Sequence, residues 1–401
     1  MPANKEKRQS MMLTGNYAAA YGAKLARVDT VPVYPITPQT TIMEKIIELI
    51  NQGDFEAEYL PMESEHSVMA AAIAAEATGV RVFTASSSQG IAYMHENLFV
   101  ASGLRLPIVM GLANRSIGPP ISIYPDHTDS LAQRDTGWIQ YYVENAQEVV
   151  DTIIQSYKVA ENKNVLLPVA VCFEGLVISH FLEPVEVPDQ GAVDDFLPAY
   201  DPDHVLLSPK KIMHLSVTVN DHYFMEYKYQ QQEAMNNAKA VIKEVDEEFG
   251  EKFGRNYGGL LKPYRMEDAE VAILSMGSSA GLARIAVDEL REEGVPIGSI
   301  KLRVFRPFPE EELQAIVGNL KLLIVLDRDV SIGMGGIVYS DVAGSLYPLK
   351  SKPALKSYIT GLGGRVLKVN ELKKLAMSAL SEIEQGEVDK PALWVGVRGL
   401  E

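Results

Sequence analysis

Short apolar runs alternate with helical segments along most of this chain of 401 residues. The runs at residues 80–86, 106–113 and 165–173 consist mostly of apolar side chains. Runs of this kind fit strands that are covered on both faces, and helices between them are typical of parallel sheets. We therefore expect an α/β fold built on parallel sheets.

The segments between the apolar runs have helical features. Residues 16–26 and 64–79 are rich in alanine, and residues 146–162 predict a further long helix. Thr41 precedes Glu44 by three residues, which is the spacing of a capping box at the start of a helix.

The alternation is interrupted once. A connector rich in proline and aspartate is followed by a long charged helix, and together they occupy about residues 181–255. From Ala269 the alternation of strands and helices resumes. We expect two parallel-sheet domains, residues 1–255 and residues 256–401.

Charge and cysteine content exclude several functions. The net charge of −16 argues against a general nucleic-acid or anionic-membrane surface. The single cysteine, Cys172, excludes an internal disulfide and an iron–sulfur cluster bound by this chain alone. A reducing, cytoplasmic setting is therefore expected. The basic first residues precede no signal-peptide core, and no apolar run reaches the ~20 residues that span a membrane.

Polar or constrained residues follow four consecutive predicted strands. These segments are "YPITP" (34–38), "MESEH" (62–66), "TASSSQG" (84–90) and residues 113–130. Parallel strands end along one edge of a sheet, and ligands bind in the crevice at that edge. We expect a binding site there.

Individual residues of these segments have more than one interpretation. Glu65 fits a functional carboxylate or a structural one at a helix N-terminus, and the pattern does not separate it from Glu63. Ser88 and Gln89 lie in a turn that fits an anion site or an ordinary capped turn. Arg115 is placed to pair with a substrate carboxylate or with a structural acid.

Two prolines surround a single threonine in the first of these segments. Pro35 and Pro38 fix their φ angles and lack backbone donors, so they should stiffen the strand end around Thr37. The segment "YPDHTD" (124–129) groups two aspartates and a histidine, but its spacing matches no common zinc or calcium pattern. We expect no metal on this chain.

Several cofactor motifs are absent from the sequence. "SIGMGG" (331–336) is not a GxGxxG dinucleotide motif, and there is no Walker A motif or GxSxG elbow. There is also no Gly-Asp-Gly followed further on by Asn, with which thiamine diphosphate enzymes hold the magnesium diphosphate.

Characteristic segments are spread in order over nearly the whole chain. They are "YPITP", "ESEHS", "FTASSSQG", "MHENLFVASGLRLPIVM", "ANR", "DHTDSLAQRDTGWIQ", "EPVEVPDQ", "VFRPFP", "GLGGR" and "LWVGVR". With these segments the sequence resembles the α subunit of the 2-oxoacid:ferredoxin oxidoreductases, closest to the pyruvate:ferredoxin oxidoreductase type. The resemblance implies a thiamine diphosphate pyrimidine-binding, transketolase-like domain followed by a transketolase-C-terminal-like domain.

The resemblance also implies an activity that several subunits share. Such enzymes of anaerobic metabolism decarboxylate a 2-oxoacid on thiamine diphosphate, reduce ferredoxin and transfer the acyl group to coenzyme A. A β subunit is expected to carry the diphosphate site with Mg²⁺, and iron–sulfur subunits the clusters. This division agrees with the missing Gly-Asp-Gly and with the single Cys172.

The family's residue roles are carried over by position. Glu65 corresponds to the glutamate that contacts N1′ of the aminopyrimidine, and Arg115 to the arginine that binds the substrate carboxylate. Thr37 corresponds to the threonine that hydrogen-bonds the substrate. The residues expected against the cofactor are Glu65, Pro35, Ser88 and Gln89.

The segment after Arg115 departs from the pattern of pyruvate enzymes. They typically have a segment resembling "ALSAPINIWGDHSD", whereas this chain has "SIGPPISIYPDHTD" (116–129). Pyruvate is the first expectation. Because this segment borders the substrate in the family, the change also leaves room for a bulkier or branched 2-oxoacid, such as phenylglyoxylate or 2-oxoisovalerate. A non-catalytic scaffold subunit of the same fold is a further alternative.

Overall fold

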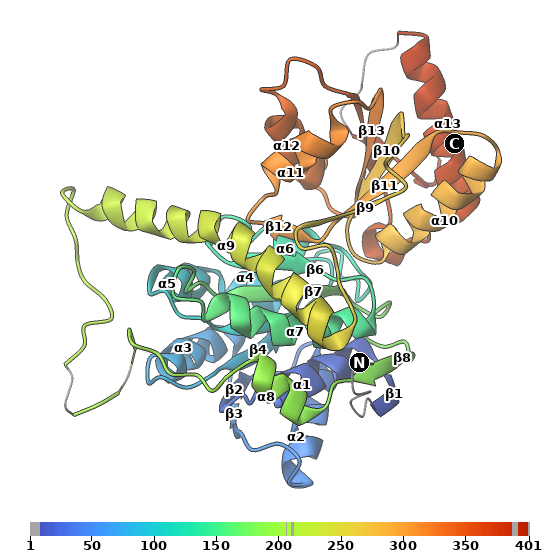
Figure 1. Cartoon of the computed structure of the whole chain (residues 1–401). Helices are drawn as coiled ribbons and strands as arrows, with labels where there is room; N and C mark the ends of the chain where they lie inside the picture. The colour runs from blue at the N-terminus through green and yellow to red at the C-terminus, as the bar shows by residue number, and fades with distance from the viewer. Residues whose placement is uncertain (1–8, 206, 210–211, 387–391, 400–401) are drawn as a thin grey trace, which may run out of the picture.

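The computed structural model describes residues 9–205, 207–209, 212–386 and 392–399. Residues 1–8, which hold most of the basic start of the chain, lie outside the described residues. Two large sheets form two layered bodies, and the long helix α9 (Phe224–Phe253) runs across the first of them (Figure 1).

The first large sheet has the strand order β12-β6-β7-β5-β4. All its pairs are parallel except β12 with β6. A second parallel pair, β2-β3, adjoins it through a bridge between Thr30 and Val82. The strands are β2 (Thr30–Val33), β3 (Glu58–Pro61), β4 (Phe83–Ser86), β5 (Val109–Asn114), β6 (Ile139–Tyr142), β7 (Val169–Glu174) and β12 (Val304–Arg306).

Helices cover both faces of this sheet. One apolar core is formed with α1 (Gly15–Leu25), α2 (Thr40–Asn51), α7 (Ala146–Ala160) and α9. A second core is formed with α3 (Glu65–Glu76), α4 (Ser88–Tyr93), α5 (His95–Gly103) and α6 (Thr128–Leu131). The expectation of parallel strands covered on both faces is thus confirmed for this sheet.

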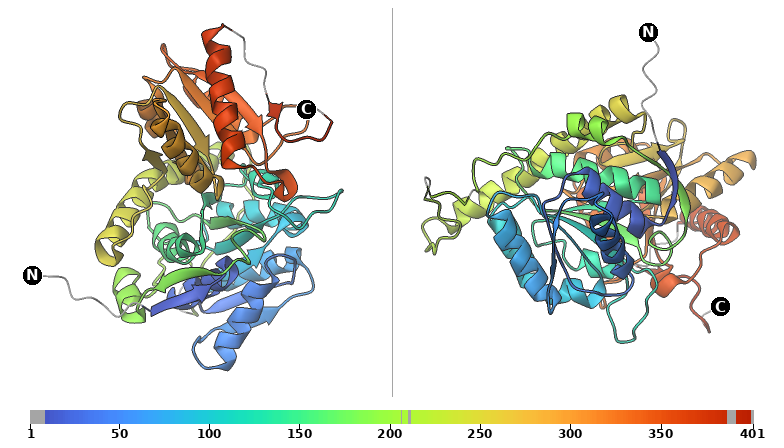
Figure 2. Two further views of the ribbon diagram at one scale, coloured as in Figure 1. Left: turned by 90° about the vertical axis from the view of Figure 1, so that its right-hand side faces the viewer. Right: turned by 90° about the horizontal axis from the view of Figure 1, so that it is seen from below.

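The second large sheet has the strand order β15-β14-β13-β10-β11-β9, and only β9 is antiparallel to its neighbour. Figure 2 shows this sheet and its helices beside the first body. Its elements are β9 (Leu261–Tyr264), β10 (Val271–Ser275), α10 (Ser279–Glu292), β11 (Ile297–Leu302), α11 (Glu310–Val317), β13 (Leu322–Asp327), α12 (Ile337–Leu346), β14 (Ala354–Ile359), the 3₁₀ turn at Leu362–Gly364, α13 (Val369–Glu384) and β15 (Leu393–Trp394).

The two bodies share apolar core. The cluster that contains Leu98 of α5 and Trp138 also contains Leu274 of β10 and Val338 of α12. The other face of the second sheet packs on α10 and α13. The division into residues 1–255 and 256–401 stays a proposal, and β12 from the second segment pairs in the first sheet.

The chain changes from one sheet to the other within the segment "IKLRVFRPF" (300–308). β11 ends at Leu302 and β12 begins at Val304. Between them, the fully buried Arg303 donates to Gly259 O at 3.0 Å and to Gln155 Oε1 at 3.0 Å. Because a buried guanidinium needs such partners, the chain changes sheet where Arg303 can reach α7.

One local expectation, the capping box at the start of α2, is wrong. Helix α2 begins at Thr40 and Gln39 is its cap residue, without a side-chain hydrogen bond, so Thr41 and Glu44 form no capping box. The Thr41 hydroxyl instead accepts a hydrogen bond from Asn16 Nδ2 at 2.7 Å.

The connector also contains regular structure that its composition does not predict. Its strand β8 (Glu183–Val187) pairs antiparallel with β1 (Gln9–Leu13), and α8 (Gln190–Phe196) follows.

Candidate active site

The loop after β2 is held by two amides. Gln39 Nε2 donates to Tyr34 O at 2.7 Å, and Asn16 Nδ2 of α1 donates to Pro38 O at 2.7 Å. The peptide bond between Thr37 and Pro38 is cis. Both amide side chains are fully buried, so they hold the loop from positions outside the proline motif.

Pro35 and Thr37 are exposed in this chain taken alone. The carbonyl oxygen of Thr37 accepts a hydrogen bond from Arg115 Nη1. Thr37 is thus joined to the predicted substrate arginine through its backbone, and the role of its hydroxyl stays a prediction.

Glu65 is buried at the first turn of α3, with 8% of its surface exposed. The helix is capped by the Ser64 hydroxyl, which accepts from Ser67 N at 3.3 Å. Glu63, which the sequence pattern could not distinguish from Glu65, is more exposed and accepts from the Ser67 hydroxyl. The two carboxylates are therefore distinguished by burial, since Glu65 is buried and Glu63 is exposed.

Gly90 of α4 lies directly against Glu65. A Cβ at this position would lie 2.7 Å from Glu65 Oε1 and 2.5 Å from Ser86 Oγ. The buried Ser86 hydroxyl has no hydrogen-bond partner within the described part of the chain. A side chain at position 90 would displace these groups, so a glycine is required for Glu65 and Ser86 to pack directly against α4.

Ser88 and Gln89 open α4 at the end of β4. Ser88 is fully buried with φ +49°, and its hydroxyl lies 2.5 Å from Ser116 O. Gln89 Oε1 accepts from Arg115 Nη2 at 2.6 Å. The turn that the sequence left ambiguous therefore contacts the arginine of the next strand end.

Arg115 follows β5, and 8% of its surface is exposed. Burial lowers the pKa of its guanidinium, while the nearby Asp129 and Glu65 carboxylates act in the opposite direction. Its two terminal nitrogens contact Thr37 O and Gln89 Oε1, whereas its buried Nε has no hydrogen-bond partner among the described residues. The group keeps hydrogen-bonding capacity for an anion.

Asp129 of α6 is fully buried beside these residues. Oδ2 accepts from Ser88 N at 2.9 Å and Arg115 N at 3.0 Å, while Oδ1 accepts from Asn114 Nδ2 at 2.7 Å and Ser130 N at 2.8 Å. Burial raises the pKa of Asp129 to about 7, although these donors act against that shift.

The segment that leads to Asp129 is anchored by the second sheet. His127 N donates to Arg328 O at 2.8 Å, just beyond the end of β13, and Val330 N donates to the Thr128 hydroxyl at 3.3 Å. Beside these bonds, the buried Glu174 at the end of β7 accepts from Ser278 N at 3.2 Å. The second sheet therefore contacts the edge that carries the candidate site at two places.

The segment from Ser116 to Pro125 passes over the same edge. A Cβ at Gly118 would lie 3.1 Å from Gln89 Nε2, so this glycine abuts the residue that contacts Arg115. The side chains of Ile121 and Tyr124 are exposed. The segment that departs from the pyruvate-type pattern therefore lies next to the candidate site.

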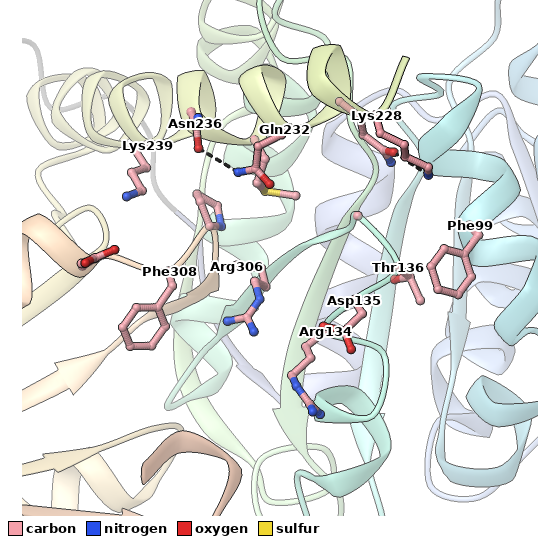
Figure 3. A pocket seen from close by; sticks show the side chains of 15 residues that line it. Phe99, Arg134, Asp135, Thr136, Lys228, Gln232, Asn236, Lys239, Arg306 and Phe308 are labelled. Carbon is pink, nitrogen blue, oxygen red and sulfur yellow. Dashed lines mark hydrogen bonds between the residues drawn. The ribbon is translucent and has the colours of Figure 1, made fainter. Parts of the chain in front are cut away.

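A separate cavity of about 570 Å³ lies between α9, the turn at 134–137 and the chain after β12. Figure 3 shows Arg134, Arg306 and Lys239 around this space. Arg306 Nη2 pairs with Asp341 Oδ2 at 2.6 Å, and Lys239 Nζ with Glu311 Oε2 at 2.6 Å. None of the predicted site residues lines this cavity.

The described residues contain no group of three or more histidine, cysteine, aspartate or glutamate side chains arranged to hold a metal ion. Among the same described residues, none of the helices is long and apolar enough to cross a membrane. Cys172 is buried in β7, and burial raises the pKa of its thiol.

The structure thus brings together most of the predicted site residues. Arg115 contacts Thr37 and Gln89, Gln89 adjoins Ser88, and Glu65 lies against the helix that Ser88 opens. Pro35 is exposed in the same loop as Thr37.

Sequence reasoning missed several residues that hold this edge in place. Asn16 and Gln39 each offered one signal, a polar side chain next to an apolar or alanine-rich run. The sequence pattern indicates Asp129 only as a candidate metal ligand, and Asn114 only as part of a strand end. The residues missed are Asn16, Gln39, Gly90, Asn114 and Asp129.

Comparison with known families accounts for both halves of the chain. Residues 21–247 match the family described as "Pyruvate flavodoxin/ferredoxin oxidoreductase, thiamine diP-bdg", the thiamine diphosphate-binding domain. Residues 269–372 match "Pyruvate:ferredoxin oxidoreductase core domain II".

Curated relatives match over almost the full length. The pyruvate synthase subunit PorA of Methanocaldococcus jannaschii is 47% identical over 390 residues, covering 96% of this chain and 98% of the relative. PorA of Pyrococcus abyssi is 45% identical over 387 residues, with the same coverage. The ketoisovalerate oxidoreductase subunit VorA of Pyrococcus furiosus is 48% identical over 386 residues, covering 96% and 97%.

Two solved structures show the same fold at low sequence identity. A 2-oxoglutarate:ferredoxin oxidoreductase from Magnetococcus marinus superposes with a TM-score of 0.72 at 17% identity, covering 92% of this chain and 65% of that one. A split-gene transketolase superposes with a TM-score of 0.52 at 12% identity, covering 91% of this chain and 98% of that one. The transketolase-like fold expected from the sequence is confirmed.

The fold and the matched domain define a thiamine diphosphate-binding chain of the transketolase-like class. The chain belongs to the pyruvate flavodoxin/ferredoxin oxidoreductase family, as the α subunit of a 2-oxoacid:ferredoxin oxidoreductase. It is accordingly one subunit of an oxidoreductase complex.

Proposed function

We propose that this chain forms the aminopyrimidine-binding half of a thiamine diphosphate site and binds the 2-oxoacid substrate, with pyruvate as that substrate. The observation that carries the proposal is the meeting of Glu65, Arg115 and the Thr37 loop at one edge of the first sheet. This edge is where parallel α/β sheets bind their ligands.

The residues around Glu65 fit the aminopyrimidine ring. Gly90 allows the carboxylate to pack against α4, and the Ser86 hydroxyl there has no partner among the described groups. When bound, thiamine diphosphate supplies the electron sink for decarboxylation. Glu65 would hold a proton between its carboxylate and N1′ of the ring. Pro35, Ser88 and Gln89 would lie along the cofactor.

Arg115 is suited to bind and orient the carboxylate of a 2-oxoacid. Its guanidinium is largely buried, and its Nε is unpaired within the part of the chain that the structure describes. A charge-assisted hydrogen bond to a carboxylate is stronger in such a setting than in water. The Thr37 hydroxyl, in the loop that Arg115 contacts, would donate to the same substrate.

The proposal includes partners, because the sequence lacks the Gly-Asp-Gly and Asn motif that holds the magnesium diphosphate. A β subunit would carry that site with Mg²⁺, and iron–sulfur subunits would pass electrons to ferredoxin in a cytoplasmic complex that uses coenzyme A. Exposed apolar side chains on α4, the helix that Ser88 and Gln89 open, and on the next helix, α5, support contact with another subunit. They include Tyr93 (59% exposed), Phe99 (39%) and Val100 (43%).

A second substrate, 2-oxoisovalerate, is favoured by one comparison and one structural feature. The VorA relative, named for ketoisovalerate, is as similar to this chain as the PorA relatives are. The segment 116–125 that abuts Gln89 is also the one that departs from the pyruvate-type pattern.

The deciding experiment uses the native complex purified from its source. It is assayed with pyruvate, 2-oxoisovalerate and phenylglyoxylate, together with coenzyme A and a viologen dye as electron acceptor. We expect the highest kcat/KM with pyruvate. Highest kcat/KM with a branched or aromatic 2-oxoacid would change the substrate assignment. Absence of thiamine-dependent reduction with every acid would overturn the proposal and favour a scaffold subunit.

A further inference from the structure

Asp129 joins the two strand ends that carry the candidate substrate residues. Its Oδ2 accepts the backbone N–H of Ser88, at the end of β4, and the backbone N–H of Arg115, at the end of β5. One carboxylate oxygen therefore sets the spacing between the turn of Gln89 and the backbone of Arg115.

The other oxygen of the same carboxylate is also fully used. Oδ1 accepts from Asn114 Nδ2 at 2.7 Å and from Ser130 N at 2.8 Å. Asn114 Nδ2 lies in addition 2.8 Å from Ser130 Oγ, and Asn114 Oδ1 has no hydrogen-bond partner among the described groups. Four N–H donors converge on a side chain that is fully buried.

The positions of these donors suggest that Asp129 fixes the positions of Ser88 and Arg115 relative to each other. Ser88 has a positive φ of 49°, which is unfavourable for a residue with a side chain, so its backbone needs fixed partners. Arg115 Nη2 must also lie 2.6 Å from Gln89 Oε1, a contact that depends on the distance between the two strand ends. Asp129 supplies that constraint from a third element, α6.

We propose that Asp129 is a positioning residue for substrate binding, which holds Arg115 and the Ser88 turn at their working distance through hydrogen-bond acceptance. The inference rests on the proposed function, since it concerns the arginine assigned to the substrate carboxylate. The proposed role requires that the Asp129 side chain accept hydrogen bonds, and it does not require a negative charge. In an Asp129→Asn variant, Asn114 can rotate its amide so that its free oxygen accepts from the new amide nitrogen, and only Ser130 N loses its acceptor.

The test compares three variants in the assembled complex. Asp129→Ala removes all four acceptor contacts, and we expect the KM for the 2-oxoacid to rise at least about ten-fold while kcat changes less than about three-fold. Asp129→Asn keeps an acceptor for Ser88 N and Arg115 N, and we expect a KM within about three-fold of wild type. Asp129→Ser, whose single oxygen is too close to the backbone to reach both donors, should follow Asp129→Ala and serves if the alanine variant does not assemble.

Asp246 provides a matched control in a different part of the molecule. It is also buried, and it accepts from Tyr257 N at 3.0 Å and Gly259 N at 2.9 Å. Asp246→Ala should lower the Tm of the complex and leave the KM unchanged. This separates a general loss of packing from misplacement of Arg115.

Two results with the Asp129 variants would overturn the inference. An unchanged KM in both Asp129→Ala and Asp129→Ser would show that Asp129 does not position Arg115. An Asp129→Asn variant as impaired as Asp129→Ala would show that acceptance from Ser88 N and Arg115 N is not sufficient to position Arg115. A wild-type complex without 2-oxoacid activity would instead refute the proposed function, so the two failures are distinguishable.

Discussion

Arg328 Nη1 lies 2.6 Å from Glu174 Oε2, and this ion pair joins the end of β13 to the end of β7. Glu174 is fully buried, which by itself would raise its pKa. The charge of Arg328, with hydrogen bonds from His127 and Ser278, instead lowers the pKa of Glu174 to about 2. The two sheets are thus connected by a carboxylate that stays ionised in the folded chain.

Acid should weaken this connection over a defined range. An unfolded glutamate has a pKa of about 4.3, so the lowered pKa contributes stability above that pH, on the order of 3 kcal/mol. The contribution is lost as the pH falls toward the lowered pKa of the folded state. Arg328→Met should lower the free energy of unfolding most near neutral pH, and its difference from wild type should shrink in acid. Urea unfolding at several pH values measures this.

The exposed pair of Arg27 and Asp194 serves as the control for that measurement. Its atoms Nη2 and Oδ2 are 2.7 Å apart, and both side chains are well exposed to water. Arg27→Met should therefore change the free energy of unfolding by less than about 1 kcal/mol. Equal effects of the two substitutions would contradict a stabilising role for Arg328.

Glu65→Gln should keep the fold and abolish most of the turnover. The amide fills the same buried space but cannot hold a proton for the cofactor ring, so we expect kcat to fall at least about 100-fold. Viologen reduction by the assembled complex measures the rate, and the Tm checks the fold. Glu63→Gln, a change at the less buried carboxylate two residues away, should leave both unaltered.

Gly90→Ala should displace the Glu65 carboxylate while leaving residue 65 a glutamate. The added Cβ would lie 2.7 Å from Glu65 Oε1, so the side chain must move or the helix must shift. We expect a loss of about 1–3 kcal/mol in stability together with a reduced kcat. Gly103→Ala is the matched control, because a Cβ there meets no atom within 4 Å. Normal activity in Gly90→Ala would argue against Glu65 as the residue at the ring.

Thr37→Val should raise the KM for the 2-oxoacid more than it disturbs the fold. Valine has nearly the same shape and keeps the backbone carbonyl that contacts Arg115, so only the hydroxyl is lost. A hydrogen bond worth about 1 kcal/mol predicts a KM increase of about five-fold. Steady-state kinetics of the complex measure it, with Thr40→Val as the comparison. An unchanged KM would remove the hydroxyl from the substrate site.

Much of the sheet architecture could be predicted from the sequence because buried parallel strands leave a plain apolar signal. The strands β5 and β7 and the helices α1 and α7 lie close to their expected positions. The change of sheet at Arg303 could not be predicted. It depends on partners far along the chain, such as Gln155, which the local pattern does not contain.

The candidate site followed from the rule that ligands bind at the strand ends, and the structure brings those ends together. The rule identified the segments but not the groups that hold them. Asp129 and Asn114 became recognisable only when their donors were placed around them, because a buried polar residue has no local sequence signature. Glu65 could likewise be distinguished from Glu63 only by its burial in the structure. The sequence shows two carboxylates two residues apart and does not indicate which of them is buried.

The pairing of β12 with β6 limits how this chain could be divided by evolution or by engineering. The two matched family segments, residues 21–247 and 269–372, suggest two portable modules. A cut between them would remove β12 and leave the fully buried β6 as an open edge, a surface that invites aggregation. Gene fission at this point would thus yield halves that depend on each other to stay folded, so the two modules are expected to be inherited as a unit.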